Sequence, residues 1–203
     1  VGAPVFCEKP LTHDPAEARR LAELAPDRLF VMDKWRYHPG VAELAAIARE
    51  RRLGTVAGLV TRRVGWGNVH DDVDATWVLA PHDLSISLEI LGALGRPEAA
   101  AAHWLGSRAE RLTGLLRGEG WWHALEVSSR SPERRRVIEL HCERGVAVLS
   151  DGWAEHVNVF TDGPEGAAEE QVETRGELPL LAELRAFVEH LAGGPPPRSS
   201  AAD

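Results

Sequence analysis

The 203-residue sequence has little lysine, little cysteine and no long apolar run. Lysine occurs only at Lys9 and Lys34, which makes both positions of interest, although the base composition of the gene could produce the same bias. Two cysteines are too few for a disulfide framework or a four-cysteine zinc site, and a reducing, cytoplasmic location suits them best. No stretch approaches the roughly 18 uninterrupted apolar residues of a transmembrane helix, so we expect no membrane association.

The sequence also lacks an excess of basic residues. It has 23 Lys and Arg against 31 Asp and Glu, a net charge of −8, and this argues against a nucleic-acid binder, since phosphate recognition usually needs a basic face. With 44% hydrophobic and 27% charged residues, it is typical of a globular protein. The N-terminus has no basic flank before an apolar run, which argues against a signal peptide, and it has no initiator Met, which predicts a start within a longer protein.

The first 33 residues have the pattern of one βαβ unit. Residues 3–7 are a short apolar run typical of a buried strand. Asp14 and Pro15 then suit the N-cap and first position of a helix that ends before Pro26. Residues 29–32 form a second apolar run, which predicts the second strand.

The remaining sequence predicts an α+β arrangement. We expect helices over 40–51 and 178–191, a strand over 55–64, a helix that starts at Pro81, and an acidic loop over 163–176. Short alternating segments predict a meander of strands at 98–105, 121–129, 135–142, 145–150 and 155–161. The predicted fold class is α/β and α+β: a terminal βαβ unit over 1–36, then an open mixed or antiparallel sheet with helices on one face over 37–203.

Seven of the twelve aromatic residues are Trp. Trp121 and Trp122 are consecutive, so in a strand they point to opposite faces, and one of them lies outside the helix-facing core. A second subunit that covers the outer face would bury such a ring, so we expect a homo-oligomer formed through the open sheet.

Three separated segments carry residues suited to chemistry: Glu8-Lys9-Pro10 after the first strand, Lys34 to Pro39 after the second, and Ala80-Pro81-His82-Asp83. In this order they resemble the Gfo/Idh/MocA oxidoreductases. The resemblance implies a Rossmann domain joined to an α/β domain with an open sheet, and hydride transfer between NAD or NADP and a hydroxyl of a sugar, cyclitol or nucleotide-sugar.

The resemblance also implies roles for individual residues. Lys9 and His82 are the expected catalytic residues. A carbinol that loses a hydride needs a base for its hydroxyl proton, which His can supply, and a Lys ammonium can stabilise the developing alkoxide. The expected cofactor-binding residues are Glu8, Lys9, Pro10 and Arg36. The expected substrate-binding residues are Lys9, Tyr37, His38, Asp74, His82 and Asp83.

The sequence departs from this family in three places. Many members have an Asp four residues before the catalytic His, where this chain has Val78. A glycine-rich GxGxxG turn is absent. The chain also stops at Asp203, soon after a Gly-Pro segment from which family members usually continue into a last helix. We therefore expect a fragment that lacks most of the Rossmann domain and that is inactive alone.

Other interpretations stay open. Glu8-Lys9-Pro10 is compatible with an ordinary strand-to-helix turn, His82 and His38 with packed structural residues, and Arg36 with an ion pair to an acid. The whole chain is compatible with a non-catalytic module for oligomerisation or ligand binding. A weaker alternative is a hydrolase with a metal cluster, formed by His70, Asp72, Asp74, His82 and Asp83; our main expectation is that the chain has no metal site.

Overall fold

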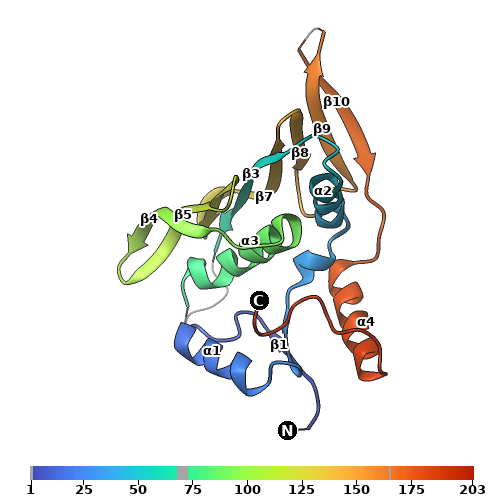
Figure 1. Ribbon diagram of the computed structural model, residues 1–203. Helices are drawn as coiled ribbons and strands as arrows, with labels where there is room; N and C mark the ends of the chain where they lie inside the picture. Colours follow the sequence, from blue (N-terminus) through green and yellow to red (C-terminus); the bar gives the residue numbers. More distant parts are fainter. Residues whose placement is uncertain (1, 68–72, 165) are drawn as a thin grey trace. The chain divides into compact units, whose positions relative to one another are not determined.

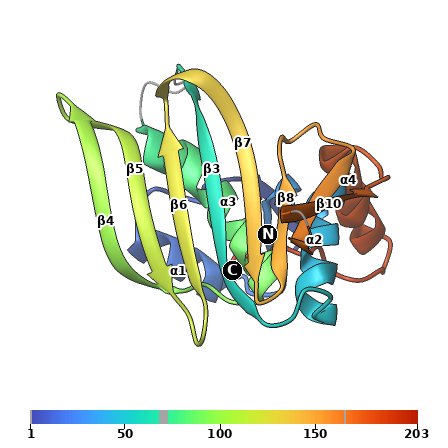
Figure 2. The same cartoon turned by 90° about the horizontal axis from the view of Figure 1, so that it is seen from above.

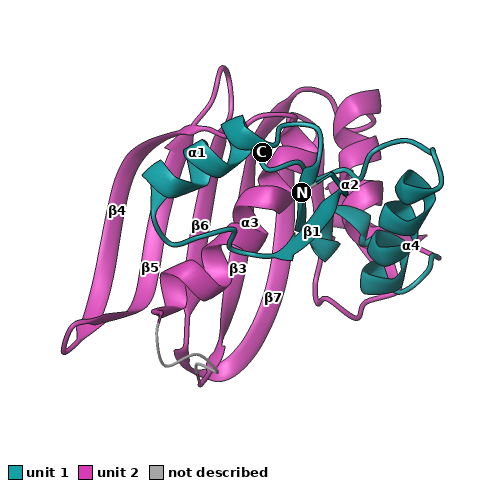
Figure 3. Ribbon diagram, turned by 90° about the horizontal axis from the view of Figure 1, so that it is seen from below, with its two compact units in different colours: residues 1–38, 176–203 teal, residues 39–175 magenta. Residues whose placement is uncertain are grey.

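The computed structural model of the chain describes residues 2–67, 73–164 and 166–203. Their contacts divide the chain into two compact units, which Figure 3 draws in different colours. Unit 1 combines Val1–His38 with Gly176–Asp203, and unit 2 is Pro39–Arg175. The C-terminal segment therefore packs in the same unit as the N-terminal strands.

Unit 1 begins with the predicted βαβ unit. Strands β1 (Val5–Glu8) and β2 (Leu29–Met32) are parallel neighbours, and helix α1 (Pro15–Leu24) connects them. The Asp14 carboxylate accepts hydrogen bonds from two backbone amides of the first turn of α1, as the N-cap prediction requires. Because Glu8 pairs with Met32, the two strands end at the same level.

Helix α4 (Pro179–Leu191) confirms the predicted C-terminal helix and packs on both strands of unit 1. The Phe187 ring stacks on Phe6 of β1 with 4.7 Å between the centroids, and it meets Phe30 of β2 edge to face. The His190 ring also meets Phe30, at 5.0 Å. These aromatic contacts fix the inward face of α4 over the strand pair.

The C-terminal tail lies along the outer edge of β2. The Val31 amide donates to the Ser199 carbonyl, and the Ala201 amide donates to the Leu29 carbonyl. Phe30 and Ser200 form an antiparallel bridge between these two bonds. The tail thus satisfies backbone groups that a two-stranded parallel sheet would otherwise leave unpaired on this edge.

Unit 2 is built on an eight-stranded sheet with the order β10-β9-β8-β7-β3-β6-β5-β4 (Figures 1 and 2). Every pair of neighbours is antiparallel except β3 and β6, which are parallel. The strands are β3 (Val56–Trp66), β4 (Arg96–Leu105), β5 (Arg108–Arg117), β6 (Trp122–Ser128), β7 (Arg130–Cys142), β8 (Gly145–Leu149), β9 (His156–Gly163) and β10 (Gly166–Glu173). This open, mostly antiparallel sheet confirms the predicted fold class.

Two helices of unit 2 pack on one face of the sheet, as Figure 2 shows. Helix α2 (Pro39–Glu50) lies against β8 and β9, and helix α3 (Ala75–Leu91) lies against β3, β5 and β6. The most deeply buried apolar residues of the unit lie on these two helices and on β3, β6, β7 and β8, and they include Val41, Leu44, Leu59, Ile86, Val127, Ile138, Leu140 and Leu149. Burial of this apolar surface is the main force that holds the helices to the sheet.

Two strands differ from the sequence-based expectation. Strand β5 was not predicted, because its apolar residues do not alternate regularly with polar ones and most of them are only partly buried. The predicted loop at 163–176 is wrong, since residues 166–173 form β10 and pair with β9 along eight positions. Almost all β10 residues are exposed, and Glu169, Glu170 and Glu173 are charged, so backbone hydrogen bonds rather than core packing define this edge strand.

Helix α3 also begins earlier than predicted. It starts at Ala75, with Asp74 as its N-cap, so Pro81 lies inside the helix and not at its start. Pro81 lacks an amide hydrogen and leaves one helical hydrogen bond unmade. Packing of α3 on the sheet offsets this loss, and Gly92 ends the helix in the left-handed conformation.

Candidate functional site

The first group of candidate residues lies at the carboxyl ends of β1 and β2. Glu8 is the last residue of β1, and Lys9 and Pro10 follow it directly, both half-buried. The segment after β2 continues through the short helix η1 (Lys34–Tyr37) to His38. Because the strands are parallel and in register, the structure brings these two predicted segments to one edge of the strand pair, where α/β sheets bind their ligands.

His38 is buried against its own segment. Its ring stacks on the Trp35 indole at 5.2 Å with 17° between the planes, and its amide donates to the Trp35 carbonyl. Both side chains are less than a tenth exposed. These contacts hold the segment after β2 in a compact turn.

Arg36 and Tyr37 bind the C-terminal tail of unit 1. The Arg36 guanidinium donates to the Asp203 carboxylate at 3.1 Å. The Tyr37 hydroxyl accepts a hydrogen bond from the Arg198 amide at 2.8 Å, and the Arg198 guanidinium lies over the Tyr37 ring. Burial raises the pKa of Tyr37, and the Arg198 contacts oppose that rise. In this structure both side chains therefore anchor the tail.

Helix α3 of unit 2 carries the second group of candidate residues. The Asp74 carboxylate accepts hydrogen bonds from the amides of Thr76 and Trp77, so it acts as the N-cap. Val78 and His82 lie one turn apart in the same helix. His82 is half-buried, and its carbonyl accepts a hydrogen bond from the Ser85 hydroxyl at 2.9 Å.

Asp83 lies on the buried face of α3 and forms an ion pair with the sheet. Its carboxylate accepts two hydrogen bonds from the Arg63 guanidinium of β3, at 2.9 and 3.4 Å, and both side chains are almost completely buried. Burial raises the pKa of Asp83, and the Arg63 charge and hydrogen bonds oppose the rise. Arg136 pairs with Arg63 across β7 and β3, and burial lowers its pKa to about 10, with repulsion from Arg63 adding to the effect. The Arg63–Asp83 ion pair ties α3 to the sheet beside His82.

A metal cluster finds no support among the described residues, which hold no group of three or more His, Cys, Asp and Glu side chains placed to bind an ion. His70 and Asp72, which the hydrolase alternative includes, lie outside the described residues. Asp74 and Asp83 serve as a helix cap and as an ion-pair partner. In the part of the chain that the structure describes, no helix is long and apolar enough to span a membrane.

Sequence reasoning missed two buried charged residues next to the candidate segments. Arg63 occupies a core-facing position of β3, and Glu183 is the one buried residue among those described in α4. Burial raises the pKa of Glu183 to about 8, and the neighbouring Asp33 carboxylate adds to the rise. The sequence signal was present: Glu183, Phe187 and His190 have the spacing of one helix face.

Comparison with known proteins defines the fold. Neither a protein-family model nor a curated protein matches the sequence. Among solved structures, the apo form of levoglucosan dehydrogenase is similar over 100% of this chain and 68% of its own, with a TM-score of 0.86 and 15% identity. The UDP-N-acetylglucosamine 3-dehydrogenase GnnA from Acidithiobacillus ferrooxidans is similar over 99% of this chain and 66% of its own, with a TM-score of 0.81 and 23% identity.

A third similar structure is an oxidoreductase from Agrobacterium radiobacter in complex with NAD+, L-tartaric acid and magnesium. It has a TM-score of 0.78 and 19% identity, over 98% of this chain and 66% of its own. The chain thus spans about two thirds of the length of these oxidoreductases. At such identities the likeness establishes a shared fold.

Proposed function

We propose that the chain is the catalytic and substrate-binding part of a nicotinamide-dependent dehydrogenase that acts on a hydroxyl of a sugar, cyclitol or nucleotide-sugar. The observation that carries this proposal is the placement of Glu8-Lys9-Pro10 and of the segment ending in His38 at the carboxyl edge of a parallel strand pair. That edge is where a dinucleotide fold holds its cofactor. The similar structures include a levoglucosan dehydrogenase solved with NADH, which supports the same class of reaction.

The proposed chemistry divides the work between two residues. The imidazole of His82 would take the hydroxyl proton of the substrate, and NAD+ or NADP+, when bound, would supply the acceptor for the hydride of the carbinol carbon. The Lys9 ammonium stabilises the developing alkoxide. Glu8, Pro10 and Arg36 would border the cofactor, and Tyr37, His38, Asp74 and Asp83 complete the proposed substrate side, with Asp83 acting through the position of α3 rather than by direct contact.

The proposal requires a longer protein, since the glycine-rich turn that receives the pyrophosphate is absent from residues 1–203. The chain alone should therefore bind NAD+ and NADP+ only weakly. Isothermal titration of the chain with each dinucleotide measures this directly. Micromolar binding to the chain alone would contradict the assignment of a missing nucleotide-binding part.

Activity is tested on the gene product that contains this chain, with NAD+ and NADP+ and a panel of hexoses, inositols and nucleotide-sugars. Lys9→Ala and His82→Ala should each lower turnover by roughly 10² to 10⁴, the usual contribution of a positioned acid or base. The matched controls, Arg20→Ala and His13→Ala, remove an exposed cation and an exposed imidazole and should leave turnover unchanged. Equal effects of the site and control variants would exclude the assigned roles.

Val78 favours one rival function, a non-catalytic module for oligomerisation or ligand binding. It lies one turn before His82 in α3, where an aliphatic side chain can neither accept a hydrogen bond nor stabilise an imidazolium. The two functions differ in the assay above. A module would bind the dinucleotide in the longer protein and turn over no substrate.

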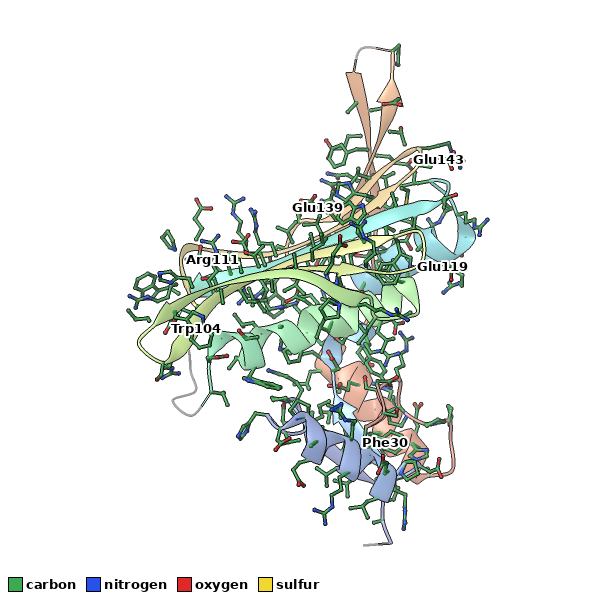
Figure 4. The ribbon with its side chains drawn as sticks, turned by 60° about the vertical axis from the view of Figure 1, so that its left-hand side comes forward. Phe30, Trp104, Arg111, Glu119, Glu139 and Glu143 are labelled. Atoms are coloured by element: carbon green, nitrogen blue, oxygen red, sulfur yellow. The ribbon has the colours of Figure 1, made fainter. Side chains whose placement is uncertain are left out.

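We also propose that a second copy of the chain covers the sheet face opposite α3. Trp122 lies on this face, since its neighbour His123 is buried in the core, and the same face carries the ion pairs of Glu126 with Arg62 and Arg111. Figure 4 shows Arg111 and Glu139 on the side of the sheet away from α3. Sedimentation velocity should show a dimer that Trp122→Arg dissociates, and a wild-type monomer at all concentrations would contradict this.

A further inference from the structure

One carboxyl group interrupts the aromatic packing between α4 and the strands of unit 1. Phe187 and His190 contact Phe6 and Phe30, and Glu183 lies one turn before Phe187 on the same inward face, only 1% exposed. Such a position in a helix interface usually carries an apolar side chain. A carboxyl there requires an explanation in terms of charge or hydrogen bonding.

The surroundings of Glu183 are mostly acidic. Asp33 and Glu8, from the ends of β2 and β1, both disfavour a negative charge on it, whereas the Lys34 ammonium favours one. Tyr37, from the same short helix as Lys34, is also close enough for an electrostatic interaction. The Asp33 amide donates a hydrogen bond to the carboxyl group of Glu183. Its buried Oε1 has no hydrogen-bond partner among the described residues.

This arrangement fits a neutral carboxylic acid better than a carboxylate. A carboxylate at this depth needs a bonded cation or several donors. The described surroundings give it one backbone amide, two neighbouring acids and the Lys34 charge, which opposes the two acids. A protonated group costs far less to bury and keeps the amide hydrogen bond. Burial accordingly raises the pKa of Glu183 to about 8.

We propose that Glu183 is a positioning residue, a buried acid that fastens α4 to the segment after β2 while it is neutral and loosens that contact when it ionises. Helix α4 packs directly on η1, so loosening at Glu183 reaches the segment Lys34–His38. The bearing on catalysis rests on the proposed function, since Arg36, Tyr37 and His38 belong to that segment. The contact itself does not depend on it.

The direction of the pH effect follows from proton linkage. The pKa of Glu183 is about 8 when α4 is docked, and a solvated Glu has a pKa of about 4.3. The docking of α4 is therefore strongest below about pH 4.3, the pKa of a solvated Glu. Its equilibrium constant falls roughly tenfold per pH unit as the pH rises from there toward 8. Above 8 the contribution stays at its minimum. Neutral pH falls within this window, so small pH changes alter how often α4 opens.

Hydrogen exchange of the chain alone tests this without cofactor or substrate. Between pH 5.5 and 7.5, the protection factors of the best-protected α4 amides should fall about a hundredfold in the wild type. Glu183→Gln keeps a neutral group of the same shape, so its protection factors should stay nearly constant over this range. Glu189→Gln removes an exposed carboxyl of the same helix and should behave as the wild type does.

A direct titration covers the case in which Glu183→Gln fails to fold. Carboxyl carbon-13 resonances of the wild-type chain should include one that titrates near pH 8, while exposed carboxyls titrate near 4. A Glu183 midpoint near 4, or the same pH dependence of α4 protection in wild type and Glu183→Gln, would overturn the proposal. In the longer protein, Glu183→Gln should flatten the alkaline limb of the pH dependence of KM for the dinucleotide. Failure of that effect alone, with the chain-level results as expected, would count against the proposed function and not against the contact.

Discussion

Two buried carboxyl groups, Asp83 in unit 2 and Glu183 in unit 1, differ in what compensates for their burial. Asp83 receives two hydrogen bonds from the Arg63 guanidinium, which balances its charge. Glu183 receives a backbone amide and faces two other acids, with the Lys34 charge acting against them. The first is thus a fixed anchor for α3 beside His82, whereas the second is sensitive to pH beside the segment after β2. Depth of burial alone does not distinguish these two roles; the bonded partner does.

The largest expected effect comes from removing the partner of Asp83. Arg63→Met leaves a buried carboxylate without its cation and should lower the free energy of unfolding of unit 2 by about 3 to 5 kcal/mol. The double variant Arg63→Met with Asp83→Leu removes both charges and should recover most of that loss. Urea unfolding at pH 7 measures both.

Arg117→Met is the matched control, because it breaks an exposed ion pair with Glu98 and should cause no measurable change. If Arg63→Met were as mild as this control, the pair would not be the anchor of α3, and the contrast with Glu183 would lose its basis.

Much of the fold can be predicted from local sequence, but elements that depend on contacts distant in the sequence cannot. The βαβ unit is readable because Asp14 and Pro15 specify a helix start between two short apolar runs. Strand β10 is not readable, since its acidic residues bury little and its backbone bonds to β9 define it. The predicted start of α3 at Pro81 is wrong, because proline usually occupies the first turn of a helix. Here packing of α3 on the sheet lets the helix begin at Ala75 and continue through Pro81.

The candidate site divides in the same way. Sequence order brings Lys9 and the segment ending in His38 to one edge, because parallel strands end together. The sequence does not predict that Arg36 bonds to Asp203, or that Asp83 bonds to Arg63. These partners are distant in the sequence, and only the fold brings them close. Whether Lys9 and His82 act together stays a prediction.

The next effect concerns acid conditions and has the opposite sign to that of Glu183. His123 is fully buried beside Thr61, with 2.9 Å between its Nε2 and the Thr61 hydroxyl, and burial lowers its pKa to about 4. Because the unfolded value is about 6.5, the stability that His123 contributes is complete above pH 6.5 and is lost as the pH falls toward 4, by up to about 3 kcal/mol. Urea unfolding at pH 7 and pH 4.5 should show this loss in the wild type, and His123→Gln should reduce it. An equal loss in both would assign acid sensitivity to other groups.

The smallest expected effect is the loss of stability when Asp74 is replaced, and it helps to distinguish a capping role from a binding role for this residue. Asp74 and Asp14 cap α3 and α1 with the same pair of backbone bonds, so Asp74→Ala and Asp14→Ala should each cost about 1 kcal/mol of stability. Thermal unfolding of the chain measures both losses. If Asp74 also contacts substrate, Asp74→Asn in the longer protein should keep the stability and raise KM, whereas unchanged kinetics would leave Asp74 a cap only.

Transfer of a label tests the proposed function most directly. The longer gene product is incubated with NAD+ or NADP+ and with hexoses, inositols and nucleotide-sugars that carry deuterium at their carbinol carbons, and the nicotinamide is examined by mass spectrometry. We predict deuterium in the reduced nicotinamide for at least one substrate, and its loss in His82→Ala. Bound dinucleotide without any transfer of deuterium from any of these alcohols would contradict the assignment as a dehydrogenase.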